Sequence, residues 1–125
     1  QGSVLAHISG NRILSNTIGI EAYHAGDLRL EGNSISDNDN GVLLRHCVTA
    51  LVAGNEILAN RGYGIRLSGT ADTASSRNLI VRNQIQGNLV GLRFETNAVN
   101  NTIRPNTNQE KRRQRRKSGG VVFSL

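Results

Sequence analysis

Polar and apolar residues alternate over short stretches of this chain, and the stretches return at a nearly fixed interval. Each copy contains Asn-x-Ile, a second Asn, and then Gly followed by an aliphatic residue. The copies begin at Asn11, Asn33, Asn55 and Asn83, so two intervals are 22 residues and one is 28. A period in this range is typical of stacked repeats.

Each repeat divides into three short strands with the period-2 alternation of a half-buried strand. The first strands are predicted at 6–8, 28–30, 50–52, 78–80 and 101–103. The second are centred on the isoleucine after each asparagine: Ile13, Ile35, Ile57 and Ile85. The third follow the glycines, at 20–22, 42–44, 65–67 and 92–94, with the first and last residues pointing inward.

Three strands per turn of about 22 residues describe an all-β solenoid, a parallel β-helix of about five coils stacked about 4.8 Å apart. Stacking places equivalent residues above one another, so the asparagines are expected to cap the bends and bond to each other in ladders. One ladder would contain Asn11, Asn33, Asn55, Asn83 and Asn106, and a weaker one Asn16, Asn38, Asn60 and Asn88. The glycines at 19, 41, 64 and 91 are expected to provide a corner with positive φ.

These Asn-x-Ile…Asn…Gly-Ile repeats, which cover about residues 4–106, resemble the right-handed parallel β-helix of the pectin-lyase superfold. Similar repeats occur in mannuronan epimerases, in chondroitinase- and alginate-lyase-like enzymes, and in the NosD-type periplasmic family. The resemblance implies a right-handed coil and a secreted, periplasmic or cell-surface location. It implies no single activity, because the repeated residues are the structural ones.

Composition agrees with one layered domain over residues 1–125. The chain has 14 Gly and only 3% aromatic residues, so its core must consist of stacked aliphatic side chains. Cys47 is the single cysteine, which excludes an internal disulfide. No apolar run is long enough to span a bilayer.

Two segments interrupt the period. Residues 70–77 are an inserted loop, a place where solenoids often carry function. Residues 107–119 are predicted to form a basic loop before a last partial coil, because the segment from Gly120 aligns with the segment from Gly91. Neither end shows a capping helix, so we expect a segment of a longer solenoid or end-to-end self-association through uncapped coils.

The outward positions of the third strands carry Arg45, Arg66, Arg93 and Glu95. Arg66 is expected above Arg93, and two like charges at the strand spacing repel each other unless an anion lies between them. In lyases and epimerases of the superfold the substrate lies along this kind of face, which favours binding of an acidic polysaccharide. The alternative is that Glu95 and solvent screen the arginines.

His24 and His46 each lie five residues after a repeat glycine and should stack on adjacent coils. With Tyr23 they are the candidates for acid/base catalysis. Together with Cys47 or Asp27 they have the side-chain types that bind zinc or copper, but no third histidine follows, and we expect no metal site.

The catalytic patterns of the resembled enzymes are missing. The Asp-Pro-His-Asp motif of the epimerases is absent, since Pro105 is the only proline. The acids are dispersed rather than clustered for calcium, so calcium is expected only if a parent protein is a lyase. We therefore predict a binding segment that is not catalytic as it stands. The alternatives are part of a polysaccharide lyase, C5-epimerase or glycoside hydrolase acting on uronate polymers, and a purely structural solenoid.

Positive charge is concentrated near the end of the sequence. Residues 1–109 have nine arginines and eight acids, a net charge of +1, whereas the whole chain has +6. The cluster consists of Lys111, Arg112, Arg113, Arg115, Arg116 and Lys117. No aromatic residues are interleaved for base stacking, so we expect non-specific polyanion binding and no specific nucleic-acid partner.

Overall fold

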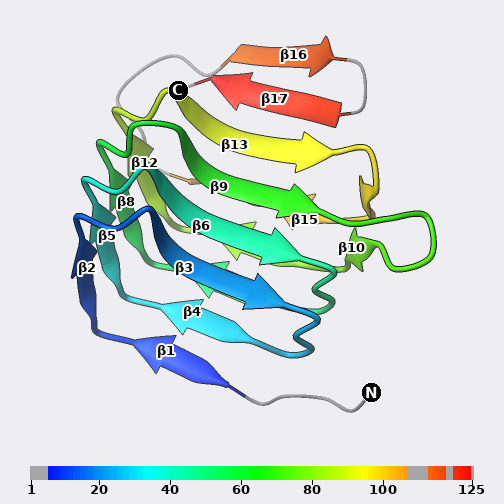
Figure 1. Cartoon of the computed structure of the whole chain (residues 1–125), viewed down its shortest axis with the longest axis horizontal. Coiled ribbons are helices and arrows are strands. Elements are labelled where there is room, and N and C mark those ends of the chain that lie inside the picture. Colours follow the sequence, from blue (N-terminus) through cyan, green and yellow to red (C-terminus); the bar gives the residue numbers. More distant parts are fainter. Residues whose placement is uncertain (1–5, 107–112, 118–119, 125) are drawn as a thin grey trace.

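The computed structural model describes residues 6–106, 113–117 and 120–124. In these residues the chain is all-β and winds into a stack of similar turns (Figure 1). The fold class predicted from the repeats is confirmed: the turns form a right-handed β-solenoid. It has about four turns, and β15 begins the next one. The described residues contain no helix that could cross a membrane.

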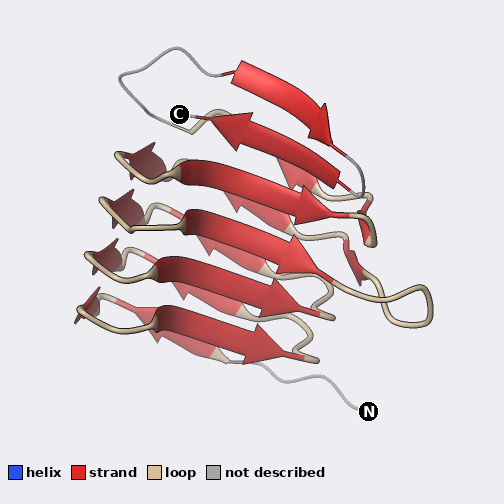
Figure 2. Cartoon of the chain, turned by 45° about the horizontal axis from the view of Figure 1, so that its top comes forward, coloured by secondary structure: helices blue, strands red, loops and turns tan. Residues whose placement is uncertain are grey.

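Three parallel sheets form the walls of the solenoid (Figure 2). Sheet 1 contains β1 (His7–Ser9), β4 (Arg29–Glu31), β7 (Leu51–Ala53), β11 (Leu79–Val81) and β15 (Thr102–Ile103). Sheet 2 contains β2 (Arg12–Leu14), β5 (Ser34–Ser36), β8 (Glu56–Leu58) and β12 (Gln84–Gln86). Sheet 3 contains β3 (Ile18–Tyr23), β6 (Asn40–Arg45), β9 (Tyr63–Ser68) and β13 (Val90–Glu95), and β17 (Gly120–Ser124) and β16 (Arg113–Lys117) extend it. A short pair, β10 (Ser75–Ser76) with β14 (Ala98–Val99), lies at one bend.

The core is built from aliphatic stacks in the predicted register. Ile13, Ile35 and Ile57 are paired in sequence order along sheet 2, and Ile57 pairs with Ile85. Ile35, Ile57 and Ile85 are fully buried, as are Val42 and Ile65 of sheet 3. Because one apolar layer repeats in every turn, aliphatic side chains fill the interior without help from large aromatic residues.

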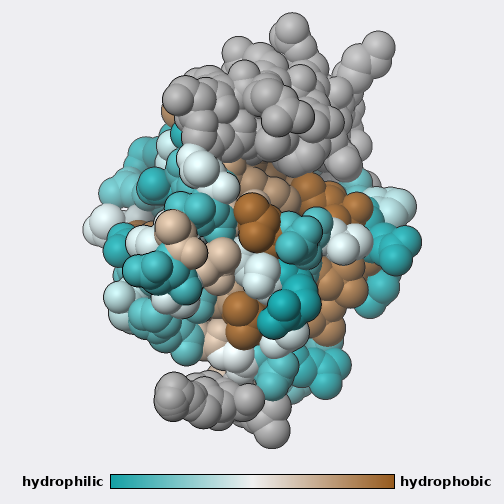
Figure 3. Space-filling model, turned by 90° about the vertical axis from the view of Figure 1, so that its right-hand side faces the viewer, coloured by the Kyte–Doolittle hydropathy of each residue, from teal (hydrophilic) through white to brown (hydrophobic). Residues whose placement is uncertain are grey.

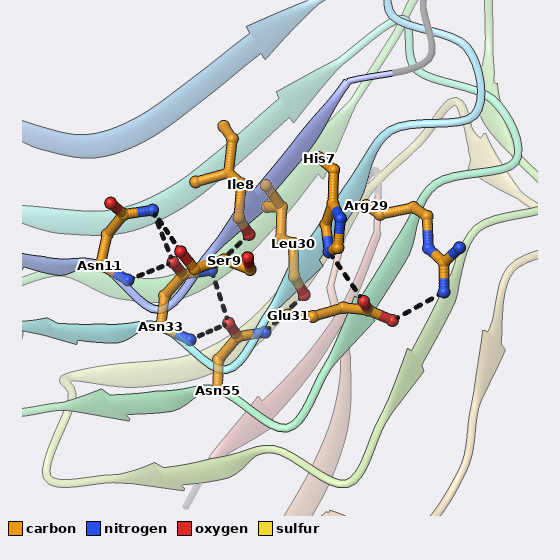
Figure 4. A network of polar contacts seen from close by, with 9 residues as sticks. All are labelled: His7, Ile8, Ser9, Asn11, Arg29, Leu30, Glu31, Asn33 and Asn55. Atoms are coloured by element: carbon orange, nitrogen blue, oxygen red, sulfur yellow. Dashed lines mark hydrogen bonds and ion pairs between the residues drawn. The ribbon is translucent and has the colours of Figure 1, made fainter.

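Asparagines satisfy the backbone at the bends. Asn33 donates its backbone N–H and its side-chain amide to Oδ1 of Asn55, at 2.9 and 3.0 Å. The same amide donates to the carbonyl of Ile8 at 2.9 Å (Figure 4). Asn55 repeats both contacts with Asn83 and with the Leu30 carbonyl. Further turns bond alike through Asn11 and Asn106, and in the second row through Asn16, Asn38, Asn60 and Asn88.

The expected role of the glycines before the third strands was wrong. Gly19, Gly41, Gly64 and Gly91 do not have positive φ; among the described residues, the glycines that do are Gly10, Gly32, Gly54 and Gly87. The reason for glycine is close packing between turns, because a Cβ on Gly41 would lie 2.5 Å from the carbonyl oxygen of Gly64. Position 41 therefore needs the absence of a side chain rather than a left-handed backbone.

The expected last partial coil was also wrong. β17 pairs with β13 antiparallel, and β16 pairs antiparallel with β17. Residues 113–117, predicted in a loop, form a strand, whereas 107–112 and 118–119 lie outside the described residues. Period-2 alternation reads the same in both directions, so the alignment of Gly120 with Gly91 could not fix the strand direction. The antiparallel pair covers the free edge of β13.

Candidate functional site

The candidate binding face is the outer side of sheet 3. Its register places Glu21, Leu43, Arg66 and Arg93 in one row across β3, β6, β9 and β13. These residues alternate with the core residues Ile20, Val42, Ile65 and Leu92, so they lie on the outer side of the sheet, where Leu43 is only 5% exposed. Tyr23, Arg45 and Ser68 occupy the row two residues further along the strands. We call this surface the arginine face.

A single carboxylate lies between the two stacked arginines. Oε2 of Glu95 accepts hydrogen bonds from Nε of Arg66 at 2.8 Å and from Nε of Arg93 at 2.7 Å. A second nitrogen of Arg93 lies 3.3 Å from Oε1. Arg66 and Arg93 thus have two positive charges and share one negative charge. The screening by Glu95 that the sequence suggested leaves one positive charge unbalanced.

The ion pairs among Arg66, Arg93 and Glu95 shift the pKa values of Glu95 and Arg93. Burial alone would raise the pKa of Glu95, but the hydrogen bond from Arg93 and the charge of Arg66 outweigh it, so the pKa lies below its ordinary value of 4.5. The hydrogen bond to Glu95 raises the pKa of Arg93 in return. Both shifts favour the charged forms of Glu95 and Arg93 at neutral pH.

Arg66 and Arg45 retain donors that face solvent. In the described part of the chain, the terminal nitrogens of Arg66 have no hydrogen-bond partner, and 39% of its side chain is exposed. Arg45 has one long contact, 3.5 Å from its Nε to Glu21. Arg66 also lies 5.2 Å from the ring of Tyr63, which holds the guanidinium over an aromatic surface.

Three aromatic side chains cluster where β3 and β6 end. The rings of His24 and His46 are stacked, with centroids 4.7 Å apart and planes inclined by 12°. Tyr23 contacts both rings edge-on, at 4.3 and 5.3 Å, and is 62% exposed. The residues predicted as catalytic candidates are thus brought together, and Tyr23 pairs with Arg45 of the arginine face.

The two histidines share a backbone conformation that recurs in this solenoid. Both have φ of 55°, in the left-handed region, and eight other described non-glycine residues have a similar positive φ. Nδ1 of His46 lies 2.7 Å from the carbonyl oxygen of Thr73, which can only accept, so Nδ1–H donates this hydrogen bond. Thr73 belongs to the inserted loop, which projects at the right of Figure 1. Figure 3 looks at that side and shows a mixed surface of hydrophilic and hydrophobic residues.

Cys47 and Asp27 do not join the histidines. Cys47 is fully buried, its sulfur directed to the carbonyls of Ala22 and Arg45, and burial raises the pKa of its thiol. Asp27 instead accepts a hydrogen bond from Thr49 at 2.6 Å. Within the described ranges, no group of three His, Cys, Asp or Glu residues is placed to hold a metal ion.

A separate ionic group lies on sheet 1, away from the predicted residues. Glu31 contacts Nε2 of His7 at 2.9 Å and a terminal nitrogen of Arg29 at 3.1 Å (Figure 4). The hydrogen bond from Arg29 is the main cause that lowers the pKa of Glu31. Glu31 thus pairs with Arg29, one negative charge with one positive charge.

Sequence reasoning considered Glu95 as a partner of the arginines but missed the contribution of Tyr63. Tyr63 directly precedes a repeat glycine, and its equivalents Ile18, Asn40 and Val90 give no aromatic signal. Of the predicted polyanion loop, Lys111 and Arg112 lie outside the described residues. Arg113, Arg115, Arg116 and Lys117 belong to β16.

The comparisons with known proteins agree with the fold. The model of a family described as periplasmic copper-binding protein (NosD) matches residues 2–120. The search of curated proteins gives no match. The crystal structure of the periplasmic alginate epimerase AlgG is similar with a TM-score of 0.76 and 19% identity, covering 83% of this chain and 28% of that one. A point mutant of that enzyme gives the same TM-score and identity over 82% of this chain. The chain thus spans less than a third of the length of these structures, and the likeness shows the fold alone.

Proposed function

The chain belongs to the NosD family, and we propose that this segment of β-helix binds an acidic polysaccharide on its arginine face without itself being an enzyme. The family description and the similar epimerase are both periplasmic, which favours a location outside the cytoplasm. Alginate, named for the similar structure, is one example of the ligand class.

The observation that carries this proposal is the unequal charge around Glu95. Two guanidinium groups share one carboxylate, and the terminal nitrogens of Arg66 have no partner in the described residues. Arginine binds carboxylates through two parallel N–H donors, so those nitrogens fit a uronate carboxylate. Exposed Tyr23 adds an aromatic surface beside Arg45, on which a sugar ring can pack.

A calorimetric titration with a polygalacturonate oligomer tests this proposal, with a neutral glucan as the reference ligand. We expect saturable uronate binding that persists at physiological salt and is absent with the glucan. Arg66→Ala should weaken it about tenfold, because a charge-assisted hydrogen bond is worth roughly 1.5–3 kcal/mol. Arg12→Ala, which removes the same charge from sheet 2, is the matched control and should change little. Equal losses in the two variants, or no uronate binding, contradict the proposal.

The aromatic cluster supports a second candidate, a site that acts on uronate polymers as part of a lyase, epimerase or hydrolase. Its supporting observation is the packing of the His24 and His46 rings against exposed Tyr23 where β3 and β6 end. Tyr23 and Nε2 of His46 would exchange a proton with the sugar, and Arg45 would neutralise its carboxylate.

Assays on a uronate polymer with calcium present test this candidate: unsaturated product reports a lyase, new reducing ends report a hydrolase, and a changed ratio of the C5 epimers reports an epimerase. Turnover that is lost in both Tyr23→Phe and His46→Gln supports it. Turnover that survives in both variants assigns the activity elsewhere. Polymer binding without any turnover leaves the binding proposal as the better account.

Copper, which the family description names, does not fit the histidine pair. Stacked rings inclined by only 12° place their nitrogens side by side rather than converging on one point. Nδ1 of His46 is already bonded to Thr73, and the Cys47 sulfur faces the core. Two imidazoles without a third ligand do not make the sites in which proteins hold copper. We therefore derive no function through copper from these residues.

A further inference from the structure

The basic run near the end of the sequence belongs to the sheet that carries the arginine face. The order of sheet 3 is β16, β17, β13, β9, β6 and β3, so β16 is its outermost strand. Figures 1 and 2 show this pair of strands continuing the layer formed by β13, β9 and β6. The sequence alone placed these charges in a loop separate from the face.

The register of the added strands continues the rows of the arginine face. Arg93 pairs with Val122, and Val122 pairs with Arg115. Arg66, Arg93 and Arg115 therefore occupy one row across the sheet. Glu95 pairs with Gly120, and Gly120 pairs with Lys117, which places Lys117 in a neighbouring row.

Alternation along β16 separates its basic residues into two sets. Residues in one row share a side of the sheet, and residues two apart on a strand do as well. The positions of Arg113, Arg115 and Lys117 therefore have the parity of Arg93. Arg116 pairs with Val121 and so lies in the row of Phe94 and Leu67, the opposite parity.

We propose that β16 is part of the ligand site, and that a linear polyanion lies across the strands of sheet 3 from Arg45 and Arg66 to Arg115. This inference rests on the proposed binding function and adds the ligand's direction and minimum length. From β6 to β16 there are four strand spacings, about 19 Å.

Because salt screens the charges of the protein, only a ligand long enough to reach both ends of the row can bind to both. At physiological ionic strength, interactions between exposed charges fade beyond about 8 Å. A short anion held at Arg66 therefore gains nothing from Arg115, whereas a polymer that spans the sheet contacts both. A linear acidic polysaccharide fits this row better than nucleic acid, because the sequence of β16, Arg-Gln-Arg-Arg-Lys, has no aromatic residue for base stacking.

The test compares Arg115→Gln with Arg116→Gln in the full chain. The two variants remove the same charge from adjacent positions of one strand, and circular dichroism shows whether both keep the fold. The ligands are a short polygalacturonate oligomer held at Arg66 alone and one long enough to reach β16. For the long oligomer we expect Arg115→Gln to weaken binding about fivefold to tenfold, the loss of one charge-assisted hydrogen bond. Arg116→Gln should change it less than about twofold, and the short oligomer should not distinguish the variants.

The outcomes separate this inference from the binding proposal. Long-oligomer binding that depends on Arg66 but falls equally in both β16 variants, or in neither, overturns the inference and leaves the proposed function intact. Absence of any uronate binding overturns both. Single-stranded DNA of equal charge that binds as tightly as the long oligomer, with equal losses in the two variants, shows an unspecific basic strand and also overturns the inference. Lys117→Gln repeats the comparison in the neighbouring row.

Discussion

Oε2 of Glu95 lies 2.7 Å from Nε of Arg93, and the same oxygen also accepts a hydrogen bond from Arg66. The chain therefore already provides one carboxylate beside the terminal nitrogens of Arg66 that we propose as the binding site for a uronate carboxylate. Glu95 orients the two guanidinium groups and competes for them at the same time. Removal of its charge should therefore change ligand binding and stability in opposite directions.

Replacement of Glu95 by glutamine should strengthen polyanion binding. The amide keeps the size of the side chain but leaves both arginines without a negative partner. We expect affinity for a uronate oligomer to rise about twofold to fivefold, the range for one partly exposed ion pair. Calorimetric titration measures it, and Glu56→Gln on sheet 2 is the control for net charge. A fall in affinity would show that Glu95 only positions the arginines.

The loss of stability caused by the same substitution should depend on pH in a defined way. The pKa of Glu95 is lowered in the folded chain, so its stabilisation is complete above the ordinary value of 4.5 and is lost as pH falls through the lowered value. Urea unfolding at pH 7 should show the Glu95→Gln variant less stable by about 1 kcal/mol. Near pH 3 the difference should shrink. A constant difference across this range would mean that the ion pairs do not stabilise the fold.

The repeat spacing was sufficient to predict the inner register of the solenoid. In a parallel stack, residues one period apart must pair, so the 22-residue interval places Ile13 on Ile35 and Ile35 on Ile57. The insertion lengthens one turn without disturbing this pairing, because Ile57 still pairs with Ile85 across 28 residues. The same logic brought His24 onto His46 and Arg66 onto Arg93.

Features that depend on three-dimensional packing were not predictable in this way. The direction of β17 is not encoded in its alternation, so the row from Arg93 to Arg115 was invisible in the sequence. Asn78 and Asn101, assigned only as strand beginnings, bond to one another at 2.8 Å and form a further bend contact. Because only these two equivalent positions carry asparagine, no repeated pattern reveals the pair.

The buried register can be tested by placing a charge in it. Ile35 is fully buried between Ile13 and Ile57, so Ile35→Asp should prevent folding, because an unpaired buried charge costs several kcal/mol of a stability of roughly 5–15 kcal/mol. Ser36→Asp changes the next residue of β5, on the outer side of the sheet, and should be tolerated. Circular dichroism and solubility measure both. A folded Ile35→Asp protein would refute the assigned register.

The asparagine rows should contribute unequally along their length. Asn55 is buried, and its amide connects Asn33, Asn83 and the Leu30 carbonyl. Asn55→Ala leaves several of these groups unpaired and should cost about 2–4 kcal/mol, since each buried unsatisfied group costs roughly 1–3 kcal/mol. Asn11 is exposed at the end of the described row, and water can replace its contacts, so Asn11→Ala should cost less than about 1 kcal/mol. Chemical denaturation of both variants measures the difference, and equal losses would show that the asparagines act only within their own turns.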